Sequence, residues 1–208
     1  MVKGSIDNSL YDKYPNLILG FHGCHLETFE RVLYRHEHLK RSENDYDWLG
    51  HGIYFWENGY ERAMEWAKVR YAEKARVIGA VIDLGYCLSL TDIRCTNVLK
   101  VGYSIMSTMY KSMGMKLPEN KNGRSAVDVL LRNLDCAVIQ QIHAYNEERG
   151  AEPYDSVRGV FSEGNAAYPG SAIPEKTHIQ ICVVNPNCIK GYFLLCHRKK
   201  GLEYHSSD

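Results

Sequence analysis

Two short segments of the chain place a polar or aromatic side chain beside glycine. Residues 21–24 read Phe-His-Gly-Cys, and residues 50–55 read Gly-His-Gly-Ile-Tyr-Phe. Because glycine has no side chain, Gly23 beside His22 and Gly52 near Tyr54 would leave room for a ligand to approach the backbone. The two segments therefore predict that His22 and Tyr54 line a common binding cleft.

Both segments have the composition of β-strands. Side chains alternate between the faces of a strand, so His22 lies opposite Leu17, Leu19 and Phe21, and we expect it to point away from most of the apolar residues. The same alternation places Tyr54 and its even-numbered neighbours on the face opposite the intervening apolar residues.

A third strand, residues 177–184, carries polar residues on one face. Ile179 and Ile181 alternate with His178 and Gln180. One interpretation is an edge or half-exposed strand whose outer face is exposed to solvent. The other is that Gln180 belongs to the same site as His22 and Tyr54.

The composition limits the class of protein. The 208 residues suffice for one domain, and 25 basic residues balance 25 acidic residues, so no global positive field recruits nucleic acid. The basic run at 197–200 is interpreted as a solvated tail. Seven cysteines, without any Cys-x-x-Cys pair, indicate reduced core thiols. With neither a signal peptide nor a membrane span, we expect a soluble cytoplasmic protein.

The remaining segments show the apolar periodicity of either a helix or a strand. Helices are predicted at 28–39, 59–75, 92–113 and 125–147, with capping boxes at Asn58 to Glu61 and at Ser125 to Asp128. Further strands are predicted at 75–84, 87–90, 157–162 and 190–196. Strands at both ends of the chain, around a helical middle, indicate an α+β fold.

The ordered motifs resemble the ADP-ribosyltransferase superfamily, in the diphtheria-toxin and poly(ADP-ribose) polymerase-like branch with a His-Tyr-Glu triad. The first motif resembles residues 21–24, and the second resembles residues 50–55 with the helix that carries Trp66. The third resembles residues 180–195. The order and spacing of all three across 17–196 are more specific than any one motif.

The resemblance implies a single domain over 1–208, built from two small sheets of mostly antiparallel strands around an NAD cleft. The two sheets would be roughly perpendicular. Residues 92–147 have no counterpart in the minimal pattern and are treated as a helical insertion of open role. NAD would be a co-substrate, and no metal is implied.

The resemblance also implies roles for the motif residues. His22 would contact the adenosine ribose, and the Gly23 backbone would pair with the nicotinamide amide. Tyr54 would stack on the nicotinamide ring, with Gly52 beside it. Either Trp66 or Tyr60 would cover the other face of the nicotinamide ring. Packing of the helix against the sheet is an equal alternative for both residues.

Gln180 departs from the family pattern, in which a glutamate binds the ribose 2′-hydroxyl and supplies negative charge. Glutamine keeps the hydrogen bond and loses the charge, which implies transfer of single units or a slower enzyme. Glu163 or Glu175 could bring a carboxylate back into the cleft; alternatively, both are surface charges.

Two residues are candidates for contact with the acceptor. His178 could act as a base, since its ordinary pKa of about 6.5 allows proton exchange near neutrality. Tyr168 lies in the loop at 164–175, where the family's acceptor-recognition loop lies, and could stack on a base or an aromatic side chain. An ordinary Pro-Gly turn is the alternative for that loop.

The sequence thus favours an NAD-dependent mono-ADP-ribosyltransferase that modifies a protein or nucleic-acid acceptor and releases nicotinamide. Such an enzyme could be a toxin or defence effector with an antidote partner, and no membrane partner is expected. One alternative is a non-catalytic NAD or ADP-ribose binding module.

Two further alternatives are open. An NAD-dependent RNA 2′-phosphotransferase would require basic residues in the cleft, for which Arg31, Arg70 and Arg158 are the candidates near the motifs. A zinc site would use residues 22–25 with His36 and His38, but the usual paired spacings are absent.

Overall fold

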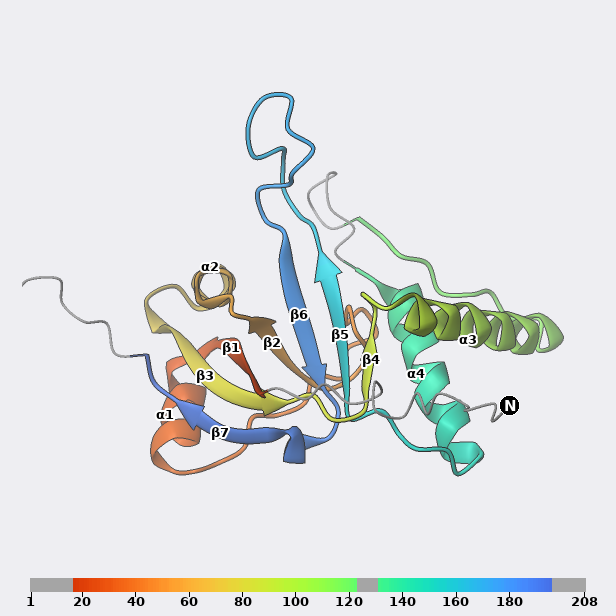
Figure 1. Cartoon of the computed structure of the whole chain (residues 1–208), viewed down its shortest axis with the longest axis horizontal. Helices are drawn as coiled ribbons and strands as arrows, with labels where there is room; N and C mark the ends of the chain where they lie inside the picture. The colour runs from red at the N-terminus through yellow and green to blue at the C-terminus, as the bar shows by residue number, and fades with distance from the viewer. Residues whose placement is uncertain (1–16, 123–130, 196–208) are drawn as a thin grey trace, which may run out of the picture.

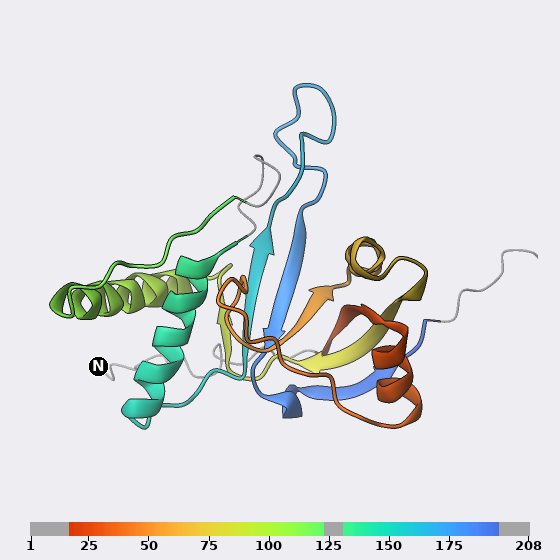
Figure 2. The ribbon, with the colours of Figure 1, turned by 180° about the vertical axis from the view of Figure 1, so that it is seen from behind.

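The computed structural model describes residues 17–122 and 131–195 as a mixed sheet with helices on both faces (Figures 1 and 2). The strands are β1 (Leu17–His25), β2 (Ile53–Glu57), β3 (Ala75–Asp83), β4 (Cys87–Ser89), β5 (Ser156–Phe161), β6 (His178–Val183) and β7 (Ile189–Phe193). The helices are α1 (Leu26–Tyr34), α2 (Tyr60–Tyr71), α3 (Ile93–Ser112) and α4 (Asn133–Glu148). The fold is therefore α+β, as predicted.

The strands form one continuous sheet rather than the two separate sheets that were expected. Its order is β4-β5-β6-β2-β1-β3-β7, and every neighbouring pair is antiparallel except β4 with β5. The sheet has two halves, β4-β5-β6-β2 and β1-β3-β7. They meet where β1 pairs with β2 through only two residue pairs, Gly20 with Glu57 and Phe21 with Trp56. Figure 1 shows β5 and β6 running steeply across the direction of β3 and β7.

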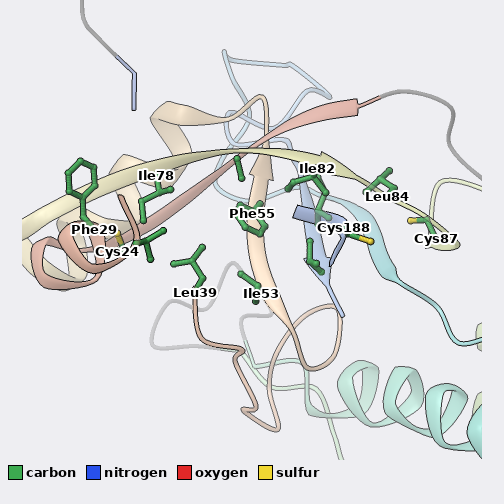
Figure 3. Packing of buried hydrophobic residues seen from close by; sticks show 14 residues of the cluster. Cys24, Phe29, Leu39, Ile53, Phe55, Ile78, Ile82, Leu84, Cys87 and Cys188 are labelled. Carbon is green, nitrogen blue, oxygen red and sulfur yellow. The ribbon is translucent and has the colours of Figure 1, made fainter. Parts of the chain in front are cut away.

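The main core lies on one face of the β2-β1-β3 region. Phe55 and Ile78 are fully buried there and pack with Cys24 on β1 (Figure 3). His22 shares the strand face of Cys24 and lies 5.7 Å from the Phe55 ring. The expectation that His22 points away from the apolar side is therefore wrong. Alternation separates the two faces of β1 correctly, but it does not say which face the helices and neighbouring strands bury more deeply.

Helices cover both faces of the β1-β3 half. Phe29 and Val32 of α1 join the main core, whereas Ala63 of α2 packs with Phe21 and Val77 on the opposite face. Alternating residues of β1 and β3 are apolar on both faces, and this half of the sheet is therefore sandwiched between helices.

The predicted helical insertion consists of α3 and α4, which follow β4 and precede β5. Met106 of α3 and Ile139 of α4 pack with Val157 and Cys182 of the sheet, all of them almost completely buried. These helices therefore cover the β4-β5-β6 half and form part of its core (Figure 2).

Several helix boundaries in the structure differ from the predicted ones. The helix predicted at 28–39 ends at Tyr34, and His36 has a positive φ of 57°. Asn58 does not cap α2, whose N-cap is Gly59 without a side-chain hydrogen bond. The helix predicted at 125–147 begins at Asn133, and the capping box at Ser125 and Asp128 lies outside the described residues.

Other boundaries agree with the sequence patterns to within a few residues. Asp92 caps α3 through a hydrogen bond from the Arg94 amide, so the predicted helix at 92–113 begins and ends almost where expected. In the described part of the chain, helices are too short or too polar to cross a bilayer.

Candidate functional site

One pocket of about 750 Å³ collects most of the predicted site residues. It is lined by the following predicted residues: His22, Gly23, Gly52, Tyr54, Trp66, Glu163 and Gln180. These come from β1, β2, α2 and the β5-β6 region, so the pocket spans the place where β1 and β2 diverge. Its volume lies within the range of roughly 300–1,000 Å³ that is usual for small-molecule sites.

His22 links the diverging strands at the pocket. Its Nδ1 lies 2.8 Å from the carbonyl oxygen of Tyr54. A carbonyl oxygen only accepts, so Nδ1 donates and the Nε2 atom of the neutral ring remains an acceptor. Burial lowers the pKa of His22, and the bond to Tyr54 opposes this effect only partly. His22 is therefore a neutral hydrogen-bonding group.

The Tyr54 hydroxyl is held by the segment just before β2. It accepts a hydrogen bond from the Leu49 amide at 2.8 Å and donates one to the Gly50 carbonyl at 2.7 Å. Burial is the main cause that raises the pKa of Tyr54 well above its ordinary value, and the Cys182 thiol adds to it. The hydroxyl thus serves the fold, and the ring is the part suited to contact a ligand.

The two glycines are required by the protein itself. A Cβ at Gly23 would lie 2.4 Å from the Ala63 carbonyl oxygen in α2, and one at Gly52 would lie 2.5 Å from the Cys182 sulfur. Both residues line the pocket, but room for a ligand is not what excludes a side chain from either position. They allow a helix and a neighbouring strand to approach closely.

Trp66, rather than Tyr60, is the α2 aromatic residue that lines the pocket. The Arg70 guanidinium lies over its ring at 4.4 Å from the centroid, a cation–π geometry. Tyr60 instead packs edge-on against Phe21 at 5.9 Å. Periodicity alone left this choice open, and the packing of α2 against β1 decides it.

Gln180 is half-buried on β6 and lies opposite Trp56 of β2. Its side-chain amide nitrogen is 3.1 Å from Nε2 of His178, whose Nδ1 is 2.9 Å from the Lys176 carbonyl. His178 itself is only 8% exposed and is not among the residues that line the pocket. The geometry therefore makes His178 a hydrogen-bonding partner of Gln180 rather than a base that faces an acceptor.

Glu163 does bring a carboxylate to the pocket. It lies 2.5 Å from Arg62 of α2, which also pairs with Glu65, and Lys176 reaches Glu65 at 2.6 Å. This ionic network ties α2 to the start and the end of the loop between β5 and β6. Glu175 is exposed and does not line the pocket.

Tyr168 lies in that same loop, which projects beyond the ends of β5 and β6 (Figure 1). Its side chain is 60% exposed, and it is not among the pocket residues. Backbone hydrogen bonds join the two sides of the loop, since the Ala167 N–H donates to the Ile173 carbonyl and the Glu175 N–H donates to the Asn165 carbonyl. The structure leaves Tyr168 available to a large partner but apart from the pocket.

Sequence reasoning missed a wall of the pocket formed by the segment before β2. Lys40, Ser42, Asn44 and Asp47 line it, and Asp47 is buried with its carboxylate accepting from the Asn44 amide at 3.0 Å. The polar composition of residues 40–49 is typical of a loop and does not by itself indicate a site. Its Ser, Asn and Asp residues, which favour such local side-chain-to-backbone bonds, were the available signal.

The residues of the zinc alternative do not converge. His22 bonds to Tyr54, Cys24 lies in the main core, and the His25 side chain accepts from the Glu27 amide at the start of α1. Within residues 17–122 and 131–195, no three His, Cys, Asp or Glu side chains are placed to hold a metal ion.

Comparison with known proteins finds a similar archaeal sequence. An uncharacterized protein of Methanocaldococcus jannaschii, MJ0359, is 26% identical over 189 residues, which cover 82% of this chain and 83% of the archaeal protein. No protein-family model matches the chain, and no solved structure matches it. The match extends over most of both chains, and the name of the archaeal protein assigns no activity.

Proposed function

We propose that this protein is an NAD-dependent mono-ADP-ribosyltransferase. The observation that carries the proposal is the convergence of His22, Tyr54 and Gln180, which are far apart in the sequence, on one pocket that also contains Trp66. Their order matches the triad order of the diphtheria-toxin and poly(ADP-ribose) polymerase-like branch, with glutamine in place of glutamate. The cleft between the two halves of the sheet would be the NAD site.

The pocket residues suit the two ends of NAD. The Tyr54 and Trp66 rings offer flat apolar surfaces for the nicotinamide. Neutral His22 offers an acceptor for a hydroxyl of the adenosine ribose, and Gln180 offers a neutral partner for a hydroxyl of the nicotinamide ribose. The Gly23 backbone remains the candidate partner of the nicotinamide amide.

The reaction would proceed through an oxocarbenium-like state at C1′ of the nicotinamide ribose, comparable to glycoside hydrolysis. The bond from C1′ to the nicotinamide nitrogen breaks, and nicotinamide leaves with the bonding electron pair. A nucleophilic atom of the acceptor forms the new bond to C1′ and loses a proton. Glu163 is the pocket carboxylate that could take this proton, after loosening its ion pair with Arg62.

The first test is incubation of the protein with labelled NAD and a cell lysate. We expect nicotinamide release and label transfer to protein or nucleic acid, both lost in Tyr54→Ala. The matched control is Tyr34→Ala, since Tyr34 is 66% exposed on α1. The proposal fails if the wild-type protein neither releases nicotinamide nor transfers label.

Binding can be followed separately, because all three tryptophans of the chain, Trp48, Trp56 and Trp66, line the pocket. NAD should therefore change the intrinsic tryptophan fluorescence. Toxicity on expression that disappears with Tyr54→Ala would favour a toxin or defence effector, and co-purification of a neutralising protein would identify an antidote partner.

A non-catalytic NAD or ADP-ribose binding module is the second candidate. It is favoured by the neutral Gln180 and by the engagement of Glu163 with Arg62. Calorimetry showing tight NAD binding without nicotinamide release over hours would support it. Turnover that is abolished by Gln180→Ala would exclude it.

The RNA 2′-phosphotransferase alternative is less well supported. Of its three candidate arginines only Arg70 lines the pocket, whereas Arg31 pairs with Glu37 and Arg158 pairs with Glu57. A 2′-phosphorylated RNA incubated with NAD should therefore remain phosphorylated.

A further inference from the structure

We infer that His178 is a positioning residue that orients the side-chain amide of Gln180, so that the amide oxygen rather than the NH₂ group is turned toward the pocket. This inference rests on the proposed function for the identity of the ligand. The orientation itself follows from the geometry around His178.

The hydrogen bonds of His178 determine which atom of Gln180 faces it. Nδ1 of His178 is 2.9 Å from the carbonyl oxygen of Lys176, which can only accept, so Nδ1 carries the ring proton. The neutral ring then presents a lone pair at Nε2. The Gln180 NH₂ group, 3.1 Å away, donates to it, whereas the amide oxygen in that place would face another acceptor.

The surroundings of His178 favour the neutral ring. The side chain is buried against the rings of Trp48, at 6.2 Å, and Phe161, at 6.1 Å. Burial is the largest influence on the pKa of His178 and lowers it, whereas the bond to the Lys176 carbonyl opposes this lowering. Arg132 lies over the same two aromatic rings and contributes a further positive charge nearby.

Charged groups from neighbouring elements act in both directions. Glu163 and Glu65 favour the protonated ring, and Arg62 between them disfavours it. Lys176 occupies the other side of Glu65. Because these charges are mutually paired, desolvation decides the direction, and the ring is neutral at neutral pH.

In the proposed triad, Gln180 stands where the family has a glutamate. A glutamine can replace glutamate as an acceptor for a ribose hydroxyl only if its oxygen, not its NH₂ group, faces the ligand. Protonation of His178 would turn Nε2 into a donor and rotate the amide, which would present NH₂ to the ligand hydroxyl. Ligand binding should thus weaken as the pH falls through the lowered pKa of His178.

The first experiment does not need a ligand. Long-range ¹H–¹⁵N NMR of the wild-type protein should show the Nδ1–H tautomer of His178 at neutral pH. The side-chain amide signals of Gln180 should shift on acidification together with the His178 ring. An Nε2–H tautomer, or Gln180 signals that ignore the ring titration, would overturn the inference whatever the protein binds.

The second experiment is a double-mutant cycle on NAD affinity, read by tryptophan fluorescence. His178→Phe keeps an aromatic ring against Trp48 and Phe161 and removes the acceptor at Nε2. We expect it to weaken NAD binding by about threefold to tenfold in the wild-type background, and hardly at all in a Gln180→Ala background. It should also abolish the loss of affinity that we expect of the wild type as the pH falls below the ordinary histidine pKa of 6.5.

The outcomes separate the two proposals. Equal weakening by His178→Phe in both backgrounds would mean that His178 only packs, which contradicts the positioning role. Coupled NMR titration without any NAD binding would leave the His178–Gln180 pair intact and refute the proposed function. If His178→Phe fails to fold, the NMR titration of the wild type decides the matter alone.

Discussion

Tyr54 illustrates how a single side chain can divide its atoms between stability and a site. Its ring lines the pocket, whereas its hydroxyl bridges the Leu49 amide and the Gly50 carbonyl. The raised pKa keeps the hydroxyl protonated, so it can donate and accept at the same time. A role of this hydroxyl in proton transfer is thereby disfavoured, and the ring is left as the part that can contact a ligand.

Tyr54→Phe separates the two roles at the residue scale. Leu49 is fully buried, so removal of the hydroxyl leaves a buried amide without its partner, and we expect a loss of about 1–3 kcal/mol in the free energy of unfolding. NAD affinity should change far less than in Tyr54→Ala, because the ring remains. Urea denaturation and fluorescence titration measure the two effects, with Tyr34→Phe as the control. An unaltered stability would contradict the hydrogen-bonding role of the hydroxyl.

At the scale of elements, α2 is the part of the fold that connects the pocket to the rest of the molecule. It approaches β1 through Gly23, carries Trp66 into the pocket, and pairs through Arg62 with Glu163 beyond β5. Displacement of α2 should therefore affect both stability and ligand binding.

Gly23→Ala tests the close approach of α2 to β1. The new Cβ would lie 2.4 Å from the Ala63 carbonyl oxygen, and helix backbone cannot move aside as a flexible side chain would. We expect a loss of about 1–3 kcal/mol in unfolding free energy together with weaker NAD binding. Gly191→Ala in β7 is the matched control, as its Cβ would meet no atom within 4 Å. Equal stability of the two variants would show that α2 tolerates displacement.

Glu65→Gln tests the ionic network by its pH dependence. The hydrogen bond from Lys176 is the largest cause that lowers the pKa of Glu65 from its ordinary value of 4.5. A lowered pKa means that the carboxylate contributes stability above the unfolded value and loses it as the pH falls through the folded value. Because Glu65 is 43% exposed, the contribution should not exceed about 1 kcal/mol.

The measurement for that variant is urea denaturation over a range of pH. Wild type should be more stable than Glu65→Gln at neutral pH, and the difference should disappear as the pH falls well below 4.5. Glu61→Gln on the exposed side of the same helix serves as the control. A difference that persists in acid would point to packing rather than charge.

At the scale of the whole molecule, the helical section between β4 and β5 belongs to the core. Met106 of α3 is 2% exposed and packs in one cluster with α4 and with Val157 and Cys182 of the sheet. The same cluster contacts the Tyr54 ring. The helices thus support the wall of the pocket rather than form an independent appendage.

Met106→Ala should therefore destabilise the entire molecule. We expect a loss of about 2–5 kcal/mol, with far-UV circular dichroism and tryptophan fluorescence reporting the same transition. Met109→Ala, at a position 40% exposed on the same helix, should change stability by no more than about 0.5 kcal/mol. A transition of the helices that precedes the fluorescence change would instead indicate a separately folding unit.

Local periodicity was sufficient to identify most elements of the described chain, including the strands that carry His22, Tyr54 and Gln180. Alternation assigned Ile53 and Phe55 to the face opposite Tyr54, and β6 contains the polar pair His178 and Gln180 where the pattern predicts them. These features depend on neighbours in sequence, which is why a single sequence determines them.

Tertiary structure alone decided how deeply those residues are buried and which distant residues they contact. Which face of β1 is buried more deeply, and why Gly23 must be glycine, depend on helices that pack from elsewhere in the chain. The pairing of Arg62 with Glu163 joins residues 101 positions apart, and His22 meets the Tyr54 carbonyl across 32. Periodicity carries no information about such distant contacts, because they arise only when the two halves of the sheet meet and enclose the pocket.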